Sequence, residues 1–203
     1  MAETTVSTPP DTEVGSTPHH RQHRFTQEEY FRMSEEGILE PDERTELIDG
    51  YIVDMVAHNA PHRAALIKTN DLLVVALHDK PYVVQTQSTL PLDCQNVPEP
   101  DLAVLGGTAD DLLEKEPDNI PLIVEVAETS LATDRTDKLV CYASNGIPEY
   151  WIVNLQAGTL EVYREPADGE YRERRTFTPG GTVTLRFDET LTVDVSDLLP
   201  RTE

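Results

Sequence analysis

The first regular pattern along the chain is a short helix followed by a β-hairpin. Thr26 and Glu29 have the spacing of a capping box, in which the hydroxyl and the acid each satisfy a free backbone N–H at the start of a helix. Gly37 ends this helix, because glycine readily adopts the left-handed conformation at a helix C-terminus. In residues 45–53, Asp-Gly separates two apolar pairs and predicts a tight hairpin, since both turn positions favour positive φ.

A longer helix is predicted after the hairpin. Pro61 lies near its first turn, and the helix ends near His78 and Asp79. Apolar residues recur at helical spacing along its length, which predicts one face packed on the core. The residues expected on that face are Leu66, Ile67, Leu73, Val74 and Leu77.

Three strands are predicted in the middle of the chain. Residues 82–90 partly alternate between apolar and polar positions, and residues 101–105 form a short apolar run. Residues 120–126 are almost continuously apolar apart from Pro121 and Glu125. A run of that kind is typical of a strand covered on both faces of its sheet.

A third helix is predicted over residues 134–145, followed by a buried strand at 149–153. Strand, helix and strand in this order indicate two parallel strands joined by a right-handed crossover. The C-terminal region is β-rich, with a Pro-Gly-Gly turn and strands expected at 160–163, 171–177, 182–187 and 191–195. Together these elements predict a mixed α/β fold in a single domain over residues 25–199, with a mixed central sheet flanked by helices.

The first 24 residues differ in composition from the rest. Val6 and Val14 are their only sizeable aliphatic side chains, among Thr, Ser, Pro, Glu and His. Such a segment buries too little apolar surface to offset the entropy cost of ordering, so residues 1–24 are predicted to be a disordered tail. The tail histidines, His19, His20 and His23, are either an adventitious chelator or flexible polar sequence.

The remaining composition favours a cytoplasmic protein with no membrane partner. No apolar run approaches the roughly 18 residues of a membrane-spanning helix, and the N-terminal segment lacks the apolar stretch of a secretory signal. Cys94 and Cys141 are too few and too far apart in sequence for a metal knuckle or a disulfide framework.

Net charge argues against a nucleic-acid function. The chain carries −22 at pH 7, from 38 acidic and 16 basic side chains. Non-specific binding to duplex DNA depends on Lys and Arg displacing counterions from phosphates, so this bulk charge opposes approach. A local basic face around Arg172, Arg174 and Arg175 stays open as an alternative. Glycine-rich phosphate loops and a nucleophile elbow are absent from the sequence.

Three acidic residues lie where burial is costly. Glu125 is inside an apolar strand, Asp101 opens another after Pro98-Glu99-Pro100, and Glu46 precedes an apolar pair in the hairpin. A buried carboxylate needs a cation, a hydrogen-bond partner or a proton. Two on neighbouring strand ends would form an oxygen-rich site for a hard divalent cation. The alternative is a solvent-facing position at a strand edge, or in a Pro-rich turn for Asp101.

Lys138 lies in the first turns of the predicted helix at 134–145, thirteen residues after Glu125. Since that helix starts from the carboxyl end of the Glu125 strand, its lysine could reach back over the sheet. The alternative is a surface ion pair with Asp134, four positions earlier, worth a few tenths of a kcal/mol. Spacing alone slightly favours the surface pair.

An ordered set of short motifs resembles the Uma-type family of proposed restriction endonucleases, within the PD-(D/E)XK nuclease superfamily. The resemblance covers about residues 25–199. It rests on ERTELIDG at 43–50, PDLAV at 100–104, VEV at 124–126, DRTDK at 134–138, and YA at 142–143 followed by GIPEYWIV at 146–153. Each motif is weak alone, and the ordered set is fairly specific.

The resemblance implies a restriction-endonuclease-like core and a set of site residues. Asp101 resembles the acid of the PD motif and Glu125 the acid of the second motif. Ala127 stands where the usual pattern has a lysine, so Lys138 would be its migrated substitute. Glu46 resembles an additional acid. His62 resembles a histidine often found in the family, with a supporting role at most; a capping or core histidine is the alternative.

The implied activity is metal-dependent hydrolysis of DNA phosphodiester bonds. Asp101 and Glu125, with Glu46, would bind Mg²⁺ or Mn²⁺, and Lys138 would orient the attacking water and counter negative charge in the transition state. The resemblance also makes a homodimer plausible. The alternative, favoured by the net charge, is an inactive nuclease-like domain used for protein interaction or homodimer assembly.

Overall fold

The computed structural model describes residues 22–40, 43–55 and 57–201. The first element is helix α1 (Gln27–Glu35), and the predicted capping box between Thr26 and Glu29 is present. It is followed by the predicted hairpin of β1 (Thr45–Ile48) and β2 (Tyr51–Asp54), whose turn residues Asp49 and Gly50 both have positive φ. Residues 1–21 lie outside the described part of the chain, so the disordered tail stays a prediction.

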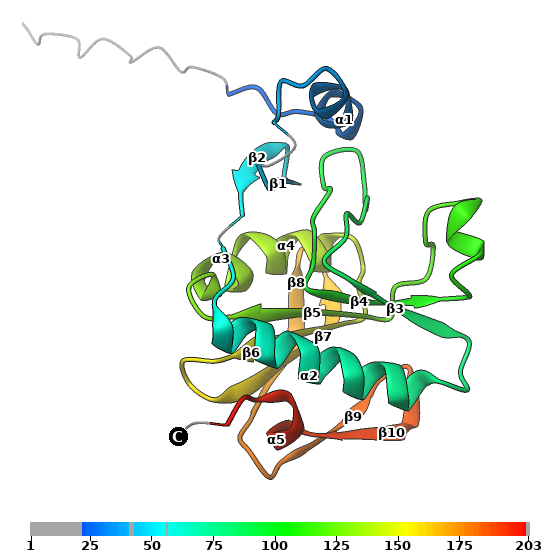
Figure 1. The fold of residues 1–203 in the computed structure, drawn as a ribbon, viewed down its shortest axis with the longest axis vertical. Coiled ribbons are helices and arrows are strands. Elements are labelled where there is room, and N and C mark those ends of the chain that lie inside the picture. Colours follow the sequence, from blue (N-terminus) through cyan, green and yellow to red (C-terminus); the bar gives the residue numbers. More distant parts are fainter. Residues whose placement is uncertain (1–21, 41–42, 56, 202–203) are drawn as a thin grey trace, which may run out of the picture.

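A six-stranded mixed sheet forms the centre of the molecule (Figure 1). Its strands, in spatial order, are β3 (Tyr82–Thr86), β4 (Leu102–Gly106), β5 (Leu122–Ala127), β6 (Glu149–Asn154), β7 (Thr159–Ala167) and β8 (Glu170–Phe177). Strands β5 and β6 pair in parallel, as predicted from the strand–helix–strand order. The other neighbours in the sheet are antiparallel. The predicted fold class is confirmed.

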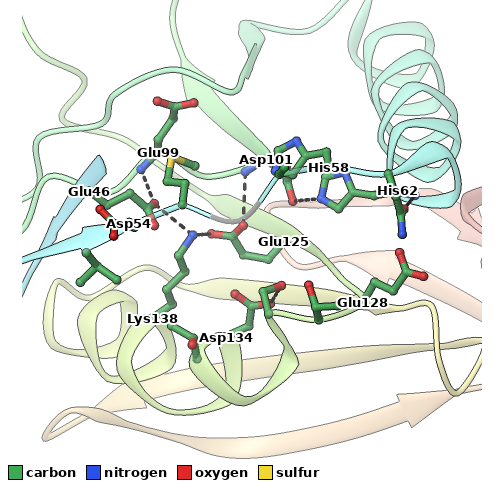
Figure 2. Close-up of a pocket in the computed structure, with 17 residues that line it drawn as sticks. Glu46, Asp54, His58, His62, Glu99, Asp101, Glu125, Glu128, Asp134 and Lys138 are labelled. Atoms are coloured by element: carbon green, nitrogen blue, oxygen red, sulfur yellow. Dashed lines mark hydrogen bonds and ion pairs between the residues drawn. The ribbon is translucent and has the colours of Figure 1, made fainter. Parts of the chain in front are cut away.

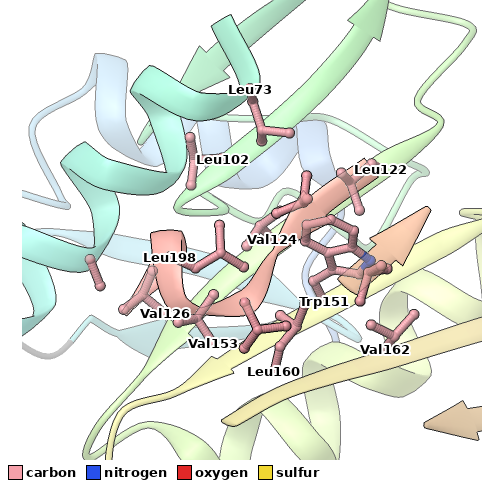
Figure 3. Packing of buried hydrophobic residues seen from close by; sticks show 14 of the residues in the cluster. Leu73, Leu102, Leu122, Val124, Val126, Trp151, Val153, Leu160, Val162 and Leu198 are labelled. Carbon is pink, nitrogen blue, oxygen red and sulfur yellow. The ribbon is translucent and has the colours of Figure 1, made fainter. Parts of the chain in front are cut away.

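Helices cover the two faces of this sheet (Figure 1). Helix α2 (Ala60–Leu77) and the short C-terminal helix α5 (Val195–Leu198) lie on one face with a hairpin of β9 (Thr182–Leu185) and β10 (Asp188–Asp194). Figure 3 shows this core, in which Leu73 and Leu198 pack around Trp151 and the valines of β5 and β6. Helices α3 (Leu131–Arg135) and α4 (Asp137–Ser144) cover the other face.

The predicted apolar face of α2 was wrong at two positions. Leu66, Leu73 and Leu77 are buried, but Ile67 and Val74 are 59% and 46% exposed. One stripe of a helix faces the sheet, and these two side chains project to its flank. None of the helices in the described ranges is both long enough and apolar enough to cross a membrane.

The single helix predicted over residues 134–145 is two helices. The chain bends at Thr136, where φ is −118° and ψ is −85°, between α3 and α4. The predicted strand at 82–90 also ends early, at Thr86, because Gln87 adopts a positive φ. A short 3₁₀ turn (Asp111–Leu113) and α5 were not predicted, since neither is long enough to show helical periodicity.

The β-rich C-terminal region is divided between two sheets. Strands β7 and β8, longer than predicted, extend the central sheet, whereas β9 and β10 form a separate pair. The predicted strand at 182–187 ends at Leu185, and the next begins at Asp188 rather than 191.

A buried carboxylate on β7 ties helix α3 to the sheet. Glu161 is 1% exposed and accepts hydrogen bonds from Arg135 of α3, Arg174 of β8, Asn154 and Tyr163. Burial raises the pKa of Glu161, but the hydrogen bonds from these partners outweigh it and lower the pKa to about 2. Arg135 is the last residue of α3, so this contact holds the end of α3 against the sheet just before the bend into α4.

The substitution Glu161→Gln tests this contact. The folded pKa lies below the unfolded value, so the charged form stabilises the fold above about pH 4.5, and that contribution disappears as the pH falls toward 2. Because charge-assisted hydrogen bonds are weakened, we expect the free energy of unfolding at pH 7 to fall by about 1–3 kcal/mol. The difference from the parent protein should shrink between pH 5 and 3. Urea unfolding across this range measures it. Asp168→Asn, at an exposed pair, serves as control, and equal curves for both variants would contradict the prediction.

Candidate active site

Strand register places Asp101 beside Glu125. Strands β4 and β5 are antiparallel with Leu102 opposite Val124, so the residue before β4 is next to the fourth residue of β5. The backbone N–H of Asp101 contacts Glu125 Oε2 at 3.4 Å. Both acids are buried, at 6% and 3% exposed. The two carboxylates predicted at neighbouring strand ends therefore lie together, and the solvent-facing alternative is wrong for both.

The hairpin brings Glu46 to the same place. Leu47 forms a β-bridge with Val97, which docks β1 against the segment leading into β4. Glu46 is 5% exposed, and its Oε1 accepts a hydrogen bond from the backbone N–H of Glu99 at 2.7 Å. Because this interaction is buried, Glu46 is not an edge charge of the hairpin.

Lys138 lies between Glu46 and Glu125 (Figure 2). Its Nζ is 3.0 Å from Oε1 of each acid, and the residue is 7% exposed. Burial lowers the pKa of this ammonium, but Glu125, Glu46 and Asp134 together raise it above its ordinary value. The lysine thus reaches back over the sheet, and the surface pair with Asp134 is wrong.

Burial also acts on the acids around Lys138. It raises the pKa of Glu125 to about 8, with the ammonium opposing the rise and nearby acids adding to it. Tyr142, one helical turn after Lys138, donates a hydrogen bond to Glu125 Oε1 at 2.7 Å. Asp134 is 1% exposed and accepts a bond from Ser130, and burial raises its pKa to about 6. Desolvation is the largest cause of both shifts, and repulsion from neighbouring acids adds to it.

Asp101 is held differently, by hydrogen-bond donors. Its Oδ2 accepts from the backbone N–H of Val126 at 2.9 Å and contacts His62 Nε2 at 3.0 Å, and its Oδ1 accepts from Gln87 at 3.1 Å. Burial raises the pKa of Asp101, but these partners outweigh it and lower the pKa below its ordinary value. His62 is therefore in contact with a site acid, and the cap of α2 is Asn59.

These groups line a cavity of about 250 Å³. Among the described residues its lining includes one lysine or arginine, Lys138, against seven acids. The acids are Glu46, Asp54, Glu99, Asp101, Glu125, Glu128 and Asp134. With this balance of charges, the cavity attracts cations and repels anions.

The sequence allowed a local basic face at three arginines of β8, but each of them is paired with an acid. Arg172 lies 3.9 Å from Asp168, Arg174 is 2.9 Å from Glu161, and Arg175 is 2.5 Å from Glu173. Their charge is largely compensated within β8 and its neighbours. This cluster therefore offers little to attract a polyanion.

Sequence reasoning missed several residues of the cavity. Tyr142 and Asp134 lie one turn on either side of Lys138, so helical spacing alone would have placed them near its side chain. His58 precedes the cap of α2, so helical spacing does not place it. Gln87 and Glu99 come from the loop between β3 and β4, where no periodic pattern could indicate their direction.

Similarity to a known family agrees with this arrangement. The family model Uma2, described as "Putative restriction endonuclease", matches residues 27–196. The chain belongs to the Uma2 family. The match includes the hairpin acid, both strand acids and the helix lysine, which lie together at one end of the sheet.

A solved structure has a similar fold. It is described as a putative nuclease belonging to DUF820 from Anabaena variabilis ATCC 29413, with 17% sequence identity and a TM-score of 0.68. The alignment covers 86% of this chain and 97% of that one. None of the curated proteins compared with the chain matches it.

The substitution Lys138→Met tests the buried ion pair of this Uma2 protein. It removes the ammonium and leaves two buried acids facing each other, which we expect to cost about 3–5 kcal/mol of unfolding free energy at pH 7. Lys115→Met is the matched control, because Lys115 is exposed and pairs with Asp118. Urea unfolding of both variants is the measurement. Equal stabilities would show that Lys138 is not held between the acids.

Proposed function

We propose that this chain is a metal-dependent endonuclease that hydrolyses phosphodiester bonds of DNA. Its family and its structural neighbour are both described as nucleases. The observation that carries the proposal is the position of Lys138, whose Nζ lies 3.0 Å from both Glu46 and Glu125. Asp101 lies beside Glu125. An amine and several carboxylates in one buried cleft are the groups that phosphodiester hydrolysis requires.

The acids fit a divalent cation. Carboxylate oxygens are the ligands that Mg²⁺ and Mn²⁺ prefer, and the cavity is lined by seven acids against one lysine. We propose that Asp101 and Glu125 bind Mg²⁺ or Mn²⁺, with Glu46 as a further ligand. When bound, the ion would neutralise charge on the scissile phosphate and lower the pKa of an attacking water.

The protein side chains have separate roles in this proposal. Lys138 holds its proton, since the surrounding acids raise its pKa, and it donates hydrogen bonds to the phosphate and to the nucleophile. Tyr142 fixes the orientation of Glu125 through its 2.7 Å hydrogen bond. His62, Val126 and Gln87 hold the Asp101 carboxylate in its charged form.

Charge sets the order of binding. An empty cavity with seven acids and one lysine repels a phosphate. DNA would therefore approach productively only after cations have entered. Cleavage should accordingly rise with metal concentration and weaken at high salt, where the few phosphate contacts are screened.

Cleavage assays test the proposal directly. Purified full-length chain with Mg²⁺ or Mn²⁺ should cut plasmid DNA, and chelation should abolish the activity. Asp101→Asn and Glu125→Gln should each lower the rate about 100-fold or more, because each removes charge that holds the cation. Asp118→Asn, at an exposed acid, should retain full activity.

Two results would count against a nuclease. One is no cleavage of plasmid, linear or single-stranded DNA with either metal. The other is activity that persists unchanged in Asp101→Asn and Glu125→Gln while circular dichroism shows that both variants are folded. The second result would indicate a contaminating enzyme.

The second candidate is an inactive nuclease-like domain that mediates protein interaction or homodimer assembly. The net charge of −22 and the paired arginines on β8 favour it. Calorimetry with Mg²⁺ separates the candidates. A nuclease should bind Mg²⁺ with a dependence on Asp101 and Glu125, whereas an inactive domain should show no such binding.

Location and assembly complete the proposal. We propose a cytoplasmic protein, since both cysteines, Cys94 and Cys141, are free. Homodimerisation is proposed by analogy with other nucleases of this fold.

A further inference from the structure

Two imidazoles lie beside Asp101, away from the contact between Lys138 and the glutamates (Figure 2). Ligand atoms of His58, His62 and Asp101 all lie within 4.8 Å of one another. In the described ranges, this is the one group of three or more His, Cys, Asp or Glu side chains with that spacing. Glu46 and Glu125 are not part of it, because their Oε1 atoms contact the Lys138 ammonium.

The start of helix α2 holds both rings in place. Asn59 caps the helix by accepting a hydrogen bond from the backbone N–H of His62, and His58 is the residue before the cap. The two rings are stacked, with centroids 3.9 Å apart and planes 16° from parallel. Their positions are therefore fixed by the helix start before any ligand binds.

His62 has one nitrogen in use and one without a partner. Its Nε2 is 3.0 Å from Asp101 Oδ2, a separation that suits a hydrogen bond and equally suits two neighbouring ligands about 2.1 Å from one ion. Its Nδ1 is buried and has no hydrogen-bond partner. With no partner at Nδ1 to fix the tautomer, Nδ1 can carry the ring proton and leave the lone pair of Nε2 facing Asp101, as an ion shared with that carboxylate requires.

The lone pair of His58 Nδ1 faces the side-chain amide of Gln87, which donates to this nitrogen at 2.8 Å and to Asp101 Oδ1 at 3.1 Å. A cation bound to His58 and Asp101 would take the place of this shared N–H donor. Neutral imidazole is the form that binds metal ions.

We propose that His58, His62 and Asp101 form a binding site for a transition-metal dication such as Mn²⁺, Co²⁺ or Zn²⁺. Imidazole nitrogen favours these ions, whereas Mg²⁺ is bound through oxygen. The surrounding acids of the cavity attract a dication and compensate its charge. What the ion does rests on the proposed nuclease function, but its binding does not. The site makes the protein selective for a transition metal over Mg²⁺.

Cobalt titration tests the site without reference to DNA cleavage. Co²⁺ bound through imidazole gives visible absorbance, and the titration follows this absorbance. The protein used is the untagged chain with His19→Ala, His20→Ala and His23→Ala, so that the tail histidines cannot bind the metal. We expect saturation at one ion per chain, and competition by Zn²⁺ but not by Mg²⁺ at equal concentration. His58→Ala and His62→Ala should each weaken Co²⁺ binding about tenfold or more, because each removes a ligand.

The control is His78→Ala. His78 and Asp79 form an exposed pair with the same 3.0 Å contact as His62 and Asp101, so a non-specific effect of losing any histidine would appear there too. The proposal predicts unchanged Co²⁺ binding in this variant. The parent is the chain that carries only the three tail substitutions. Equal Co²⁺ affinity of the parent, His58→Ala and His62→Ala would overturn the proposal. A Co²⁺ signal that is present in the unsubstituted chain and absent from the parent would also overturn it.

A second measurement covers the case in which His58→Ala or His62→Ala does not fold. Pulsed electron paramagnetic resonance of the parent loaded with one Cu²⁺ should show nitrogen modulation from two imidazoles. A spectrum without any imidazole modulation would overturn the site. The two proposals remain separable. Metal-dependent cleavage without histidine-dependent Co²⁺ binding leaves the nuclease and removes this site. Histidine-dependent Co²⁺ binding without DNA cleavage leaves this metal site and removes the nuclease proposal.

Discussion

The cleft at one end of the central sheet depends on a single buried ammonium. Lys138 lies 3.0 Å from both Glu46 and Glu125, in a region where water is largely excluded. Desolvating these charges is expensive, and their mutual attraction compensates only while all three groups are in position. The β1–β2 hairpin, strand β5 and helix α4 each contribute one of the three. The ion pairs therefore join elements that are far apart in the sequence.

Most of the surrounding fold serves to hold that arrangement. The register of β4 and β5 sets Asp101 beside Glu125, and the bridge between Leu47 and Val97 docks the hairpin against the loop that carries Glu99. On the other side, the contact of Glu161 with Arg135 holds the end of α3 against the sheet, just before the bend into α4. The remaining acids keep an excess of negative charge that one lysine does not balance, and this excess is the basis for the proposed cation site.

Much of this was predictable from the sequence. The capping box of α1, the Asp-Gly hairpin and the parallel pairing of β5 and β6 follow from local patterns, and carboxylates inside apolar strands indicated Glu125 and Asp101. The position of Lys138 did not follow from spacing, because spacing slightly favours a surface pair with Asp134. Only tertiary packing of α4 on the sheet decides between them. Gln87 and His58 come from segments without periodicity, so their directions are set by contacts that no local pattern encodes.

The central claim is that a dication binds at Asp101 in this acid-lined cleft. Anomalous X-ray diffraction from crystals soaked in Mn²⁺ tests it most directly, because the metal is located without reference to activity. We predict a peak within direct ligand distance of an Asp101 oxygen, with Glu125, His58 or His62 supplying further ligands. Well-ordered crystals with no peak at Asp101, or with Mn²⁺ bound only at exposed carboxylates, would contradict the account.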